Sequence, residues 1–410
     1  MQSWTPSHSA PAFPCADPRP VRFNRGRPMN AATPNVRNAG AARGPSLRRP
    51  TEADFMRRAL GLAERGRGRT APNPVVGAVL VRGGRVVAEG WHRALGERHA
   101  EVEALARAGR AARGATLFVT LEPCAHWGRT PPCVDALIAA GIARCVIALR
   151  DPDPRVNGRG IRKLRAAGVR VELGLLAAEA REQLAGYRLA HERGRPRVTW
   201  KVAASLDGRI ADARGRSRWI TGAEARADGH RLRAASDAIL VGAGTARADD
   251  PRLTARVNGA AIQPLRVVVD SRLRLPRTLR AFTPPLARGT VVACTNAAPD
   301  ARERALVARG VNVWRLPSRR GRVSLVALAE RLAREGRHEL LLEGGATLGA
   351  AFLEAGLVQR LVLYVAPFVL GGGLAWCDGL NRSLASAARG RLDSFARLGR
   401  DARIVVDLEG

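Results

Sequence analysis

The chain is poor in aromatic residues, in lysine and in long apolar runs. Aromatic residues make up 4% of its 410 positions, and Lys163 and Lys201 are its only lysines. No segment approaches the roughly 18 to 20 apolar residues that cross a membrane, so we predict a protein without membrane spans. Because aromatic side chains are scarce, the sequence also lacks the basic and aromatic stripe on which nucleic-acid bases stack. A hydrophobic content of 46% is still enough for the cores of two ordinary domains.

Acidic residues are also few, and 68 lysines and arginines against 36 aspartates and glutamates give a net charge of +32. Such a charge favours non-specific adhesion to nucleic acids at low salt. The arginines are spread along the whole chain, however, and arginine replaces lysine almost everywhere, which indicates a coding bias more than a binding surface. We therefore predict small-molecule substrates and no specific nucleic-acid partner. A nucleic-acid substrate stays open as the alternative.

Cysteine is scarce too. The six cysteines show no spacing typical of a disulfide framework, which fits a reducing, cytoplasmic environment. Residues 1–50 hold nine prolines, eight arginines and one acidic residue, and they lack the apolar stretch of a signal peptide. A segment of this composition cannot bury enough apolar surface to fold, so we predict a disordered basic extension. Two domains are expected to follow, over residues 51–195 and 196–410.

The most informative stretch runs from His99 to Cys133. It contains H-A-E, with His99 and Glu101, and then P-C-A-H-W-G-R-T-P-P-C, with Cys124 and Cys133. Zinc takes nitrogen and sulfur ligands, and a catalytic zinc site keeps a fourth position for water. We predict His99, Cys124 and Cys133 as the zinc ligands. Glu101 is then free to move protons, which is the arrangement of the zinc-dependent nucleobase deaminases.

The chemistry explains these residue types. The metal acidifies a water molecule for attack on a ring carbon that bears an amine, and a nearby carboxylate moves the proton to the leaving ammonia. We expect helices that begin at His99 and just after Pro131, where the helix dipole favours thiolate. In the structural alternative, the histidine and glutamate start a solvated helix and the cysteines are buried small residues. The eight residues between the cysteines depart from the C-x-x-C of the general deaminase signature.

The long cysteine spacing is part of a wider resemblance. Further motifs follow in order: P-N-P-V-V-G (72–77), D-P-D-P (151–154), K-V-A-A-S-L-D-G-R (201–209) and A-D-D-P-x-L-T (248–254). This series resembles the bifunctional deaminase/reductase family of riboflavin biosynthesis over about residues 52–408. The resemblance implies a cytidine-deaminase-like three-layer α/β/α domain followed by a dihydrofolate-reductase-like α/β domain. It also implies Zn²⁺ and NADPH as cofactors.

The second domain alternates apolar strands with helices, which predicts a largely parallel sheet covered on both faces. L-L-L-E-G-G-A-T-L-G (340–349) runs from an apolar strand through glycines into a helix. Glycines let a backbone approach a phosphate, and a helix N-terminus supplies free N–H groups. The stretch is not the G-x-G-x-x-G fingerprint, so it does not indicate a Rossmann domain. A purely structural glycine turn is the alternative.

The resemblance also assigns roles to single residues. Predicted contacts with the cofactor are Ala203, Trp219, Thr245, Asp249, Ser271, Gly345, Ala346, Thr347, Leu348, Gly349, Ala350 and Ala351. Predicted contacts with the substrate are Asn73, Ser217, Arg233, Leu253, Arg256 and Glu343. Arg233 and Arg256 suit a phosphate because guanidinium pairs with it bidentately. As alternatives, Asn73 forms a turn by bonding its own backbone, and Trp219 covers the core.

Together these features predict two consecutive steps of riboflavin biosynthesis. The first domain would deaminate 2,5-diamino-6-ribosylamino-4(3H)-pyrimidinone 5′-phosphate. The second would reduce the ribosyl chain of 5-amino-6-(5-phosphoribosylamino)uracil to ribityl with NADPH, with Lys201 and Asp249 near the reacting sugar carbon. The alternatives are a deaminase of nucleic acids, an enzyme with one active half, and a non-enzymatic protein on a deaminase fold. The first alternative leaves the motifs of the second domain unexplained, and intact motifs in both halves disfavour the second. The presence of Glu101 and of all three predicted ligands disfavours the third, and a homo-oligomer is left open.

Overall fold

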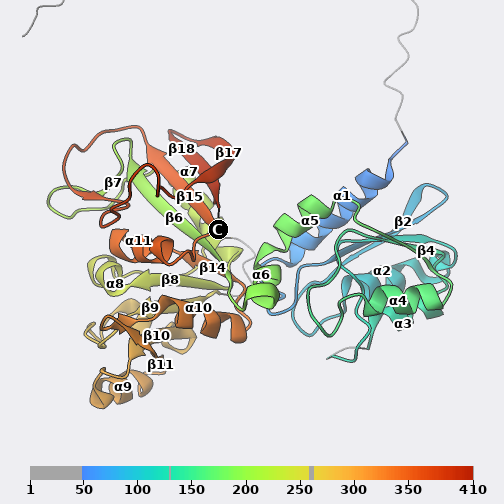
Figure 1. The fold of residues 1–410 in the computed structure, drawn as a ribbon, viewed down its shortest axis with the longest axis horizontal. Coiled ribbons are helices and arrows are strands. Elements are labelled where there is room, and N and C mark those ends of the chain that lie inside the picture. Colours follow the sequence, from blue (N-terminus) through green and yellow to red (C-terminus); the bar gives the residue numbers. More distant parts are fainter. Residues whose placement is uncertain (1–48, 129–130, 258–262, 410) are drawn as a thin grey trace, which may run out of the picture. The chain divides into compact units, whose positions relative to one another are not determined.

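The computed structural model describes residues 49–128, 131–257 and 263–409, which form two αβ regions (Figure 1). The predicted basic extension over residues 1–50 lies almost wholly outside the described residues. Within the described ranges, no helix combines the length and the apolar character needed to cross a membrane.

The first region is built on a five-stranded sheet with the order β2-β1-β3-β4-β5. Its strands are β1 (Gly77–Arg82), β2 (Arg85–Trp91), β3 (Thr116–Val119), β4 (Arg144–Ile147) and β5 (Arg170–Leu173). β2 and β3 pair antiparallel with β1, whereas β3, β4 and β5 run parallel to one another. The sheet is therefore mixed.

Helices cover both faces of this sheet. On one face, α2 (Ala100–Ala108), α3 (Cys133–Ala139) and α4 (Arg159–Ala166) share a core with Ala78 and Leu80. On the other, α1 (Glu52–Ala63), α5 (Ala177–Gln183) and α6 (Ala185–Arg193) share a core with Val79 and Val81. Successive strand residues point to opposite faces, so one apolar strand feeds both cores. The three-layer α/β/α architecture is confirmed.

Two local details shape the helices of this region. Residues 174–195 form two helices, because the backbone leaves the helical conformation at Leu184 (φ −100°, ψ 15°), whose side chain is buried in the core. α1 begins at Thr51 with a reciprocal capping arrangement, in which Thr51 Oγ1 accepts from the Asp54 N–H and the Asp54 carboxylate accepts from the Thr51 N–H. Short 3₁₀ turns follow α1 and α2, η1 (Glu64–Gly66) and η2 (Gly109–Ala112).

The second region is built on a nine-stranded sheet with the order β11-β10-β9-β8-β14-β6-β15-β18-β17. Its strands are β6 (Arg197–Ser205), β8 (Ala238–Gly242), β9 (Leu265–Val269), β10 (Thr290–Thr295), β11 (Asn312–Leu316), β14 (Glu339–Leu342), β15 (Arg360–Ala366), β17 (Gly390–Leu398) and β18 (Asp401–Leu408). All pairs from β11 to β15 are parallel, and β18 and β17 continue antiparallel. The predicted, largely parallel sheet is confirmed.

Helices again pack on both faces. α10 (Leu325–Arg334) and α11 (Ala346–Glu354) contribute to one core, and α8 (Ala243–Asp249) and α9 (Asp300–Val307) to another. α7 (Ala223–Ala234) packs in a third, smaller cluster with β15 and β18. The remaining short elements are β7 (Arg209–Ala211), β12 (Ser318–Arg319), β13 (Arg322–Val323), β16 (Leu374–Ala375), η3 (Arg280–Phe282) and η4 (Ala287–Gly289). The C-terminal ends of β6, β14, β8 and β9 lie at one edge of the sheet, where open α/β sheets place their ligand sites.

Candidate active sites

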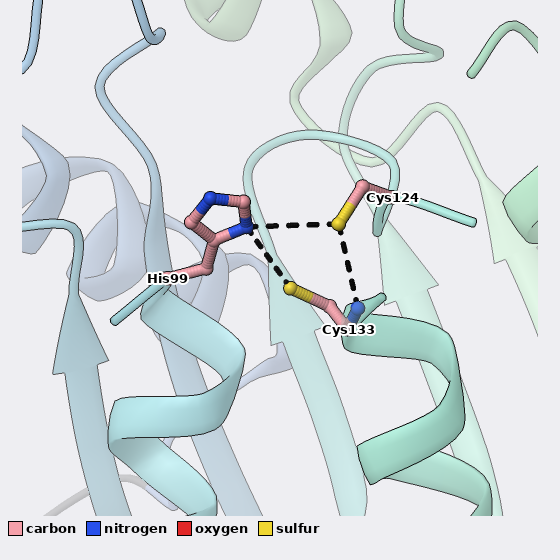
Figure 2. A group of neighbouring side chains, drawn as sticks. All are labelled: His99, Cys124 and Cys133. Carbon is pink, nitrogen blue, oxygen red and sulfur yellow. Dashed lines mark hydrogen bonds between the residues drawn. The ribbon is translucent and has the colours of Figure 1, made fainter. Parts of the chain in front are cut away.

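Three side chains of the first region converge on one point (Figure 2). His99 Nδ1 lies 3.1 Å from Cys133 Sγ and 3.6 Å from Cys124 Sγ, and all three potential ligand atoms lie within 4.8 Å of one another. His99 precedes the first turn of α2, Cys133 opens α3, and Cys124 lies in the loop after β3. The predicted ligand set is therefore brought together by two helix N-termini and one strand end.

A glycine beneath α2 helps to place this group. A Cβ atom at Gly90, on β2, would lie 2.2 Å from the carbonyl oxygen of Ala100 and 2.5 Å from the N–H nitrogen of Ala104. Any side chain there would push α2 away from the sheet. The missing side chain at Gly90 thus sets the height of His99 and Glu101 above β2.

The electrostatics of the cluster favour metal binding and proton transfer. Burial raises the pKa of the Glu101 carboxyl to about 6, against the opposing effect of the His99 imidazole. The Cys133 thiol and the His99 imidazole hold the pKa of the Cys124 thiol well below its usual range, and the backbone N–H of Cys133 donates to the same sulfur at 3.4 Å. A thiol with a lowered pKa is readily deprotonated to thiolate, and thiolate is the form that binds metals.

Asn73 lies beside the cluster in a short hydrogen-bond chain. The Nδ1 of His92 faces the carbonyl oxygen of Arg98 at 3.1 Å, and its Nε2 lies 3.1 Å from Asn73 Nδ2. A carbonyl can only accept, so His92 Nδ1 carries the proton and Nε2 accepts from the Asn73 amide. The Asn73 side chain therefore bonds to His92, which differs from the turn-forming alternative. The His92 ring also stands edge-on to the His99 ring, with 5.2 Å between centroids.

The second region holds a cavity of about 1820 Å³. Most of the residues predicted to meet cofactor or substrate in this region line it: Ala203, Ser217, Trp219, Arg233, Thr245, Asp249, Leu253, Arg256, Ser271, Glu343, Gly345, Ala346, Thr347, Leu348 and Ala351. Gly349 and Ala350 are not among the lining residues and are buried. Lys201 lines the same cavity.

The position of Gly349 shows why it is absent from the lining. A Cβ atom at Gly349 would lie 1.9 Å from Cζ2 of Trp200, on β6, so α11 packs directly on the indole ring. One turn earlier, the Gly345 N–H donates to Thr245 Oγ1 at 2.9 Å and ties the glycine loop to α8. Gly349 therefore supports the loop from below, while Gly345 to Leu348 face the cavity.

Arg233 and Glu343 form a largely buried, bidentate ion pair. Arg233 Nε and Nη2 lie 2.8 Å and 2.5 Å from the two Glu343 oxygens. Burial would raise the pKa of the Glu343 carboxyl, but Lys201 and Arg233 outweigh it and bring the pKa to about 2. Arg256 is exposed and its side chain bonds only to Thr254 Oγ1, at 3.4 Å, within the described chain. Of the two predicted phosphate ligands, Arg256 is thus the one whose guanidinium is available.

The remaining predicted residues cluster around the ends of β8 and α8. Ser217 Oγ donates to Asp249 Oδ1 at 3.2 Å, so these two side chains meet. Trp219 is 67% exposed at the cavity and stacks with Arg226, whose guanidinium carbon lies 4.7 Å from the ring centroid. The alternative that Trp219 covers the core is therefore wrong. Leu253 is buried and adopts a positive φ of 51°, which bends the chain at the cavity wall.

His92 is the residue of the first site that sequence reasoning missed. Its only sequence signal is a lone histidine after an apolar strand, and such a residue is more often a satisfied core histidine. Only the folded chain brings it between Asn73 and His99.

Two family descriptions match the chain. Residues 50–149 match the cytidine and deoxycytidylate deaminase zinc-binding region, and residues 196–403 match the RibD C-terminal domain. The fold and sites thus define a two-domain enzyme that joins a zinc-binding deaminase to a reductase. The riboflavin biosynthesis protein RibD of Escherichia coli (strain K12) is 43% identical over 362 residues, which cover 85% of this chain and 96% of that protein. RibD of Chlamydia trachomatis is 46% identical over 343 residues, covering 82% and 90%.

Solved structures agree. Form 1 of Acinetobacter baumannii RibD superposes with a TM-score of 0.81 at 38% identity, covering 87% of this chain and 99% of that one. A diaminohydroxyphosphoribosylaminopyrimidine deaminase/5-amino-6-(5-phosphoribosylamino)uracil reductase from Thermotoga maritima gives a TM-score of 0.78 at 33% identity, covering 87% and 98%. The chain belongs to the RibD family of bifunctional riboflavin-biosynthesis enzymes. Its first domain is of the zinc-binding deaminase type and its second of the NADPH-dependent RibD reductase type.

Proposed function

We propose that the first region deaminates 2,5-diamino-6-ribosylamino-4(3H)-pyrimidinone 5′-phosphate and that the second reduces the ribosyl chain of the resulting 5-amino-6-(5-phosphoribosylamino)uracil with NADPH. The observation that carries the proposal is the convergence of His99, Cys124 and Cys133 beside a buried Glu101. The arginine-rich cavity with its glycine loop supports the second step. The name of the Thermotoga maritima relative contains both activities.

The side chains of the first site fit a zinc ion. One imidazole nitrogen and two sulfurs lie within 4.8 Å of one another, and mixed nitrogen and sulfur donors are the set that zinc prefers. We assign His99, Cys124 and Cys133 as its ligands. The chemistry that the ion supplies when bound is the activation of water for attack on the ring carbon.

The surrounding residues then complete the hydrolysis. Glu101 takes a proton from the attacking water and delivers it to the departing amine, so a C–O bond forms, the C–N bond breaks and ammonia leaves. Its burial beside the ligands keeps the carboxyl close to the reacting atoms and away from solvent. Asn73, held by His92, would offer its Oδ1 as an acceptor to a substrate N–H or O–H.

In the second region the cavity residues bind and orient the reactants. NADPH supplies the hydride. We assign its phosphates to the backbone N–H groups of the loop from Gly345 to Leu348 at the start of α11. Gly349 and Ala350 support that loop from the sheet side. Lys201 and Asp249 are proposed near the sugar carbon.

The substrate phosphate fits Arg256, and Arg233 holds Glu343 as an anion beside it. A guanidinium with no carboxylate partner among the described residues can pair with a phosphate without first giving up another contact. Because the pKa of Glu343 lies at about 2, its carboxylate is an acceptor throughout the neutral range. A hydroxyl of the sugar chain is the matching donor.

We place the boundary between the domains near residue 195. Ala180, Leu184 and Tyr187, on or next to α5 and α6, are buried with the first core, and the second sheet begins at Arg197. The described cysteines 124, 133, 145, 294 and 377 are free thiols, which supports a reducing, cytoplasmic location. Small-molecule substrates, and no specific nucleic-acid partner, complete the proposal.

The test is a coupled assay on the purified protein with the diamino pyrimidinone phosphate, followed by mass spectrometry. Conversion of amine to carbonyl adds about one mass unit without cofactor, and NADPH then adds about two more, because the hydride step is borne by the cofactor. The first shift alone would show that the second region is a scaffold. No mass shift in a zinc-loaded sample would contradict the proposed substrate and favour the alternative of a nucleic-acid substrate.

A further inference from the structure

Residues 253–256, which we call the strap, follow the wall of the second cavity without forming a helix or a strand. Leu253 and Arg256, at its two ends, line the cavity. Because the strap belongs to no regular element, its backbone N–H and carbonyl groups depend on partners from other parts of the chain. Those partners therefore decide where the strap places Arg256.

Two side chains hold the middle of the strap. Gln263 binds Ala255 on both sides, since its Oε1 accepts from the Ala255 N–H at 2.9 Å and its Nε2 donates to the Ala255 carbonyl oxygen at 3.0 Å. Arg233 Nη1 donates to the carbonyl oxygen of Thr254 at 3.1 Å. The arginine that holds Glu343 thus also holds the strap.

The end of the strap is held by His230. This residue lies three positions before Arg233 on α7, so the two side chains share one face of the helix. The backbone N–H of Arg256 donates to His230 Nδ1 at 3.3 Å. A backbone N–H can only donate, so Nδ1 is the acceptor and the proton of the neutral imidazole is on Nε2. An imidazolium carries protons on both nitrogens and could not make this contact.

The surroundings keep His230 in the neutral form that this contact requires. Burial and the guanidinium groups of Arg233 and Arg256 lower the pKa of the imidazole to about 4, against the opposing effects of the Glu343 carboxylate and the Thr254 backbone. Nδ1 is therefore available as an acceptor throughout the neutral range.

The backbone contact matters because little else fixes Arg256. Its side chain is exposed, and its guanidinium bonds only to Thr254 Oγ1, at 3.4 Å, within the part of the chain that the structure describes. A long side chain that must be ordered when a ligand binds lowers the affinity for that ligand. A fixed backbone at Arg256 reduces the number of positions from which the guanidinium must be ordered.

We propose that His230 is a positioning residue of the reductase site, which holds the backbone of Arg256 so that the guanidinium meets the phosphate of the sugar-phosphate substrate. Gln263 assists by holding the residue before it. The inference rests on the proposed function, since it takes Arg256 as the ligand of the substrate phosphate. His230 itself is not among the residues that line the cavity, so it acts through Arg256 and not on the substrate.

The test compares His230→Phe, which removes the acceptor, with His230→Asn, whose Oδ1 restores one close to the helix. The matched control is Ala227→Phe, which adds the same ring at an exposed position of α7 that does not line the cavity. Steady-state kinetics of the zinc-loaded, full-length protein use 5-amino-6-(5-phosphoribosylamino)uracil and its dephosphorylated form, each with NADPH. The deaminase rate and the urea midpoint of the second region report on folding.

His230→Phe should raise the KM for the phosphorylated substrate by about fivefold, the value of one ordinary hydrogen bond, with kcat and the KM for NADPH unchanged. The kcat/KM for the dephosphorylated substrate should stay within twofold of the parent, because that substrate has no phosphate to position. His230→Asn should recover most of the loss, and the control should show none.

A double variant sharpens the assignment. His230→Phe combined with Arg256→Gln should lose no more than Arg256→Gln alone, since the positioning has no effect once the guanidinium is gone. Gln263→Leu removes the neighbouring contact at an exposed residue and should raise the same KM, which keeps the test available if His230→Phe lowers the urea midpoint.

Equal losses for the phosphorylated and dephosphorylated substrates, or additive losses in the double variant, would overturn the positioning role of His230. An unchanged KM in both His230→Phe and Gln263→Leu would overturn it as well. If the parent protein did not reduce the phosphorylated substrate with NADPH at all, the proposed function of the second region itself would be wrong. The two failures are thereby distinguished.

Discussion

The two candidate sites are built in opposite ways. The first takes its ligands and its carboxylate from 35 consecutive residues, from His99 to Cys133, that start two helices and end one strand. The second collects single side chains from β6, β8, β9, α7, α8 and α11 around one sheet edge. A compact site concentrates its chemistry in a few atoms, whereas a dispersed site depends on the fold that holds its parts together. Substitutions should therefore affect chemistry alone in the first site, and chemistry together with stability in the second.

The largest expected effect is at the centre of the compact site. Glu101→Gln removes the proton carrier and keeps the shape of the side chain, so the deaminase rate should fall by about 10²- to 10⁴-fold. Zinc content, measured by atomic absorption, and the reductase rate should stay unchanged. Loss of zinc in this variant would contradict the assignment, because it would make Glu101 a ligand.

A change in the dispersed site should cost stability as well as activity. Glu343→Gln leaves Arg233 and Lys201 without their buried anion, and breaking such a pair costs about 3 kcal/mol or more. We expect a lower urea midpoint in the second region and a loss of reductase activity, with the deaminase rate intact. Hydrogen exchange of peptides from β14 and α7 would locate the loss. Unchanged protection there would show that the pair is not a structural element.

The next effect is a pH dependence within the first region. Burial raises the pKa of Asp151 to about 7, while its Oδ1 accepts from the N–H of Asp153 at 2.9 Å and from the hydroxyl of Tyr187 at 3.1 Å. Between about pH 4 and about pH 7 the folded chain holds a proton that the unfolded chain has released, so stability falls as pH rises through this window.

Asp151→Asn keeps the acceptor oxygen and removes the titration. Above pH 7 this variant should be more stable than the parent by an amount of the order of 4 kcal/mol, since each of roughly three pKa units corresponds to about 1.4 kcal/mol, and the advantage should vanish near pH 4. Urea unfolding at several pH values, followed by hydrogen exchange of residues 144–173, measures the difference. A constant difference across the pH range would argue against a titrating Asp151.

The smallest effect tests whether the compact site extends beyond its motif. His92→Phe removes the acceptor that orients Asn73, and kcat/KM of deamination should fall by about tenfold, the value of one misplaced hydrogen bond. His92→Gln restores an acceptor oxygen and should recover part of the loss. Asn73→Ala combined with His92→Phe should lose little more than Asn73→Ala alone. Additive losses would show that the two residues act independently.

This contrast also explains how much of the molecule the sequence could predict. The convergence of His99, Cys124 and Cys133 follows from local rules, since helix starts and strand ends are set by neighbouring residues. The three-layer first domain and the parallel part of the second sheet follow from apolar periodicity. In contrast, His92 joins the first site only through a strand pairing, and the ion pair between Arg233 and Glu343 spans 110 positions. No local pattern carries such information.

For the same reason, the second site was predicted through resemblance and not through spacing. The resemblance groups Gly349 with the cofactor loop, yet within α11 this residue faces Trp200 and not the cavity. A helix turns its residues through all directions within one turn, so neighbours in sequence face opposite sides. The pairing of Arg233 with Glu343 also could not be predicted from the sequence, because an arginine binds a phosphate and a carboxylate equally well.

The contact between Gly349 and Trp200 couples the substitutions that these two positions accept. With the indole ring in place, a methyl group at position 349 has no room, so alanine there becomes accessible only after residue 200 has become smaller. Replacing Trp200 by a smaller residue first opens a void beneath α11, and such a void lowers the stability of the fold. Either substitution alone is therefore unfavourable, and related chains should differ at both positions or at neither. A double-mutant cycle with Gly349→Ala and Trp200→Leu measures this coupling. A chain that keeps one of the two residues is expected to keep the other.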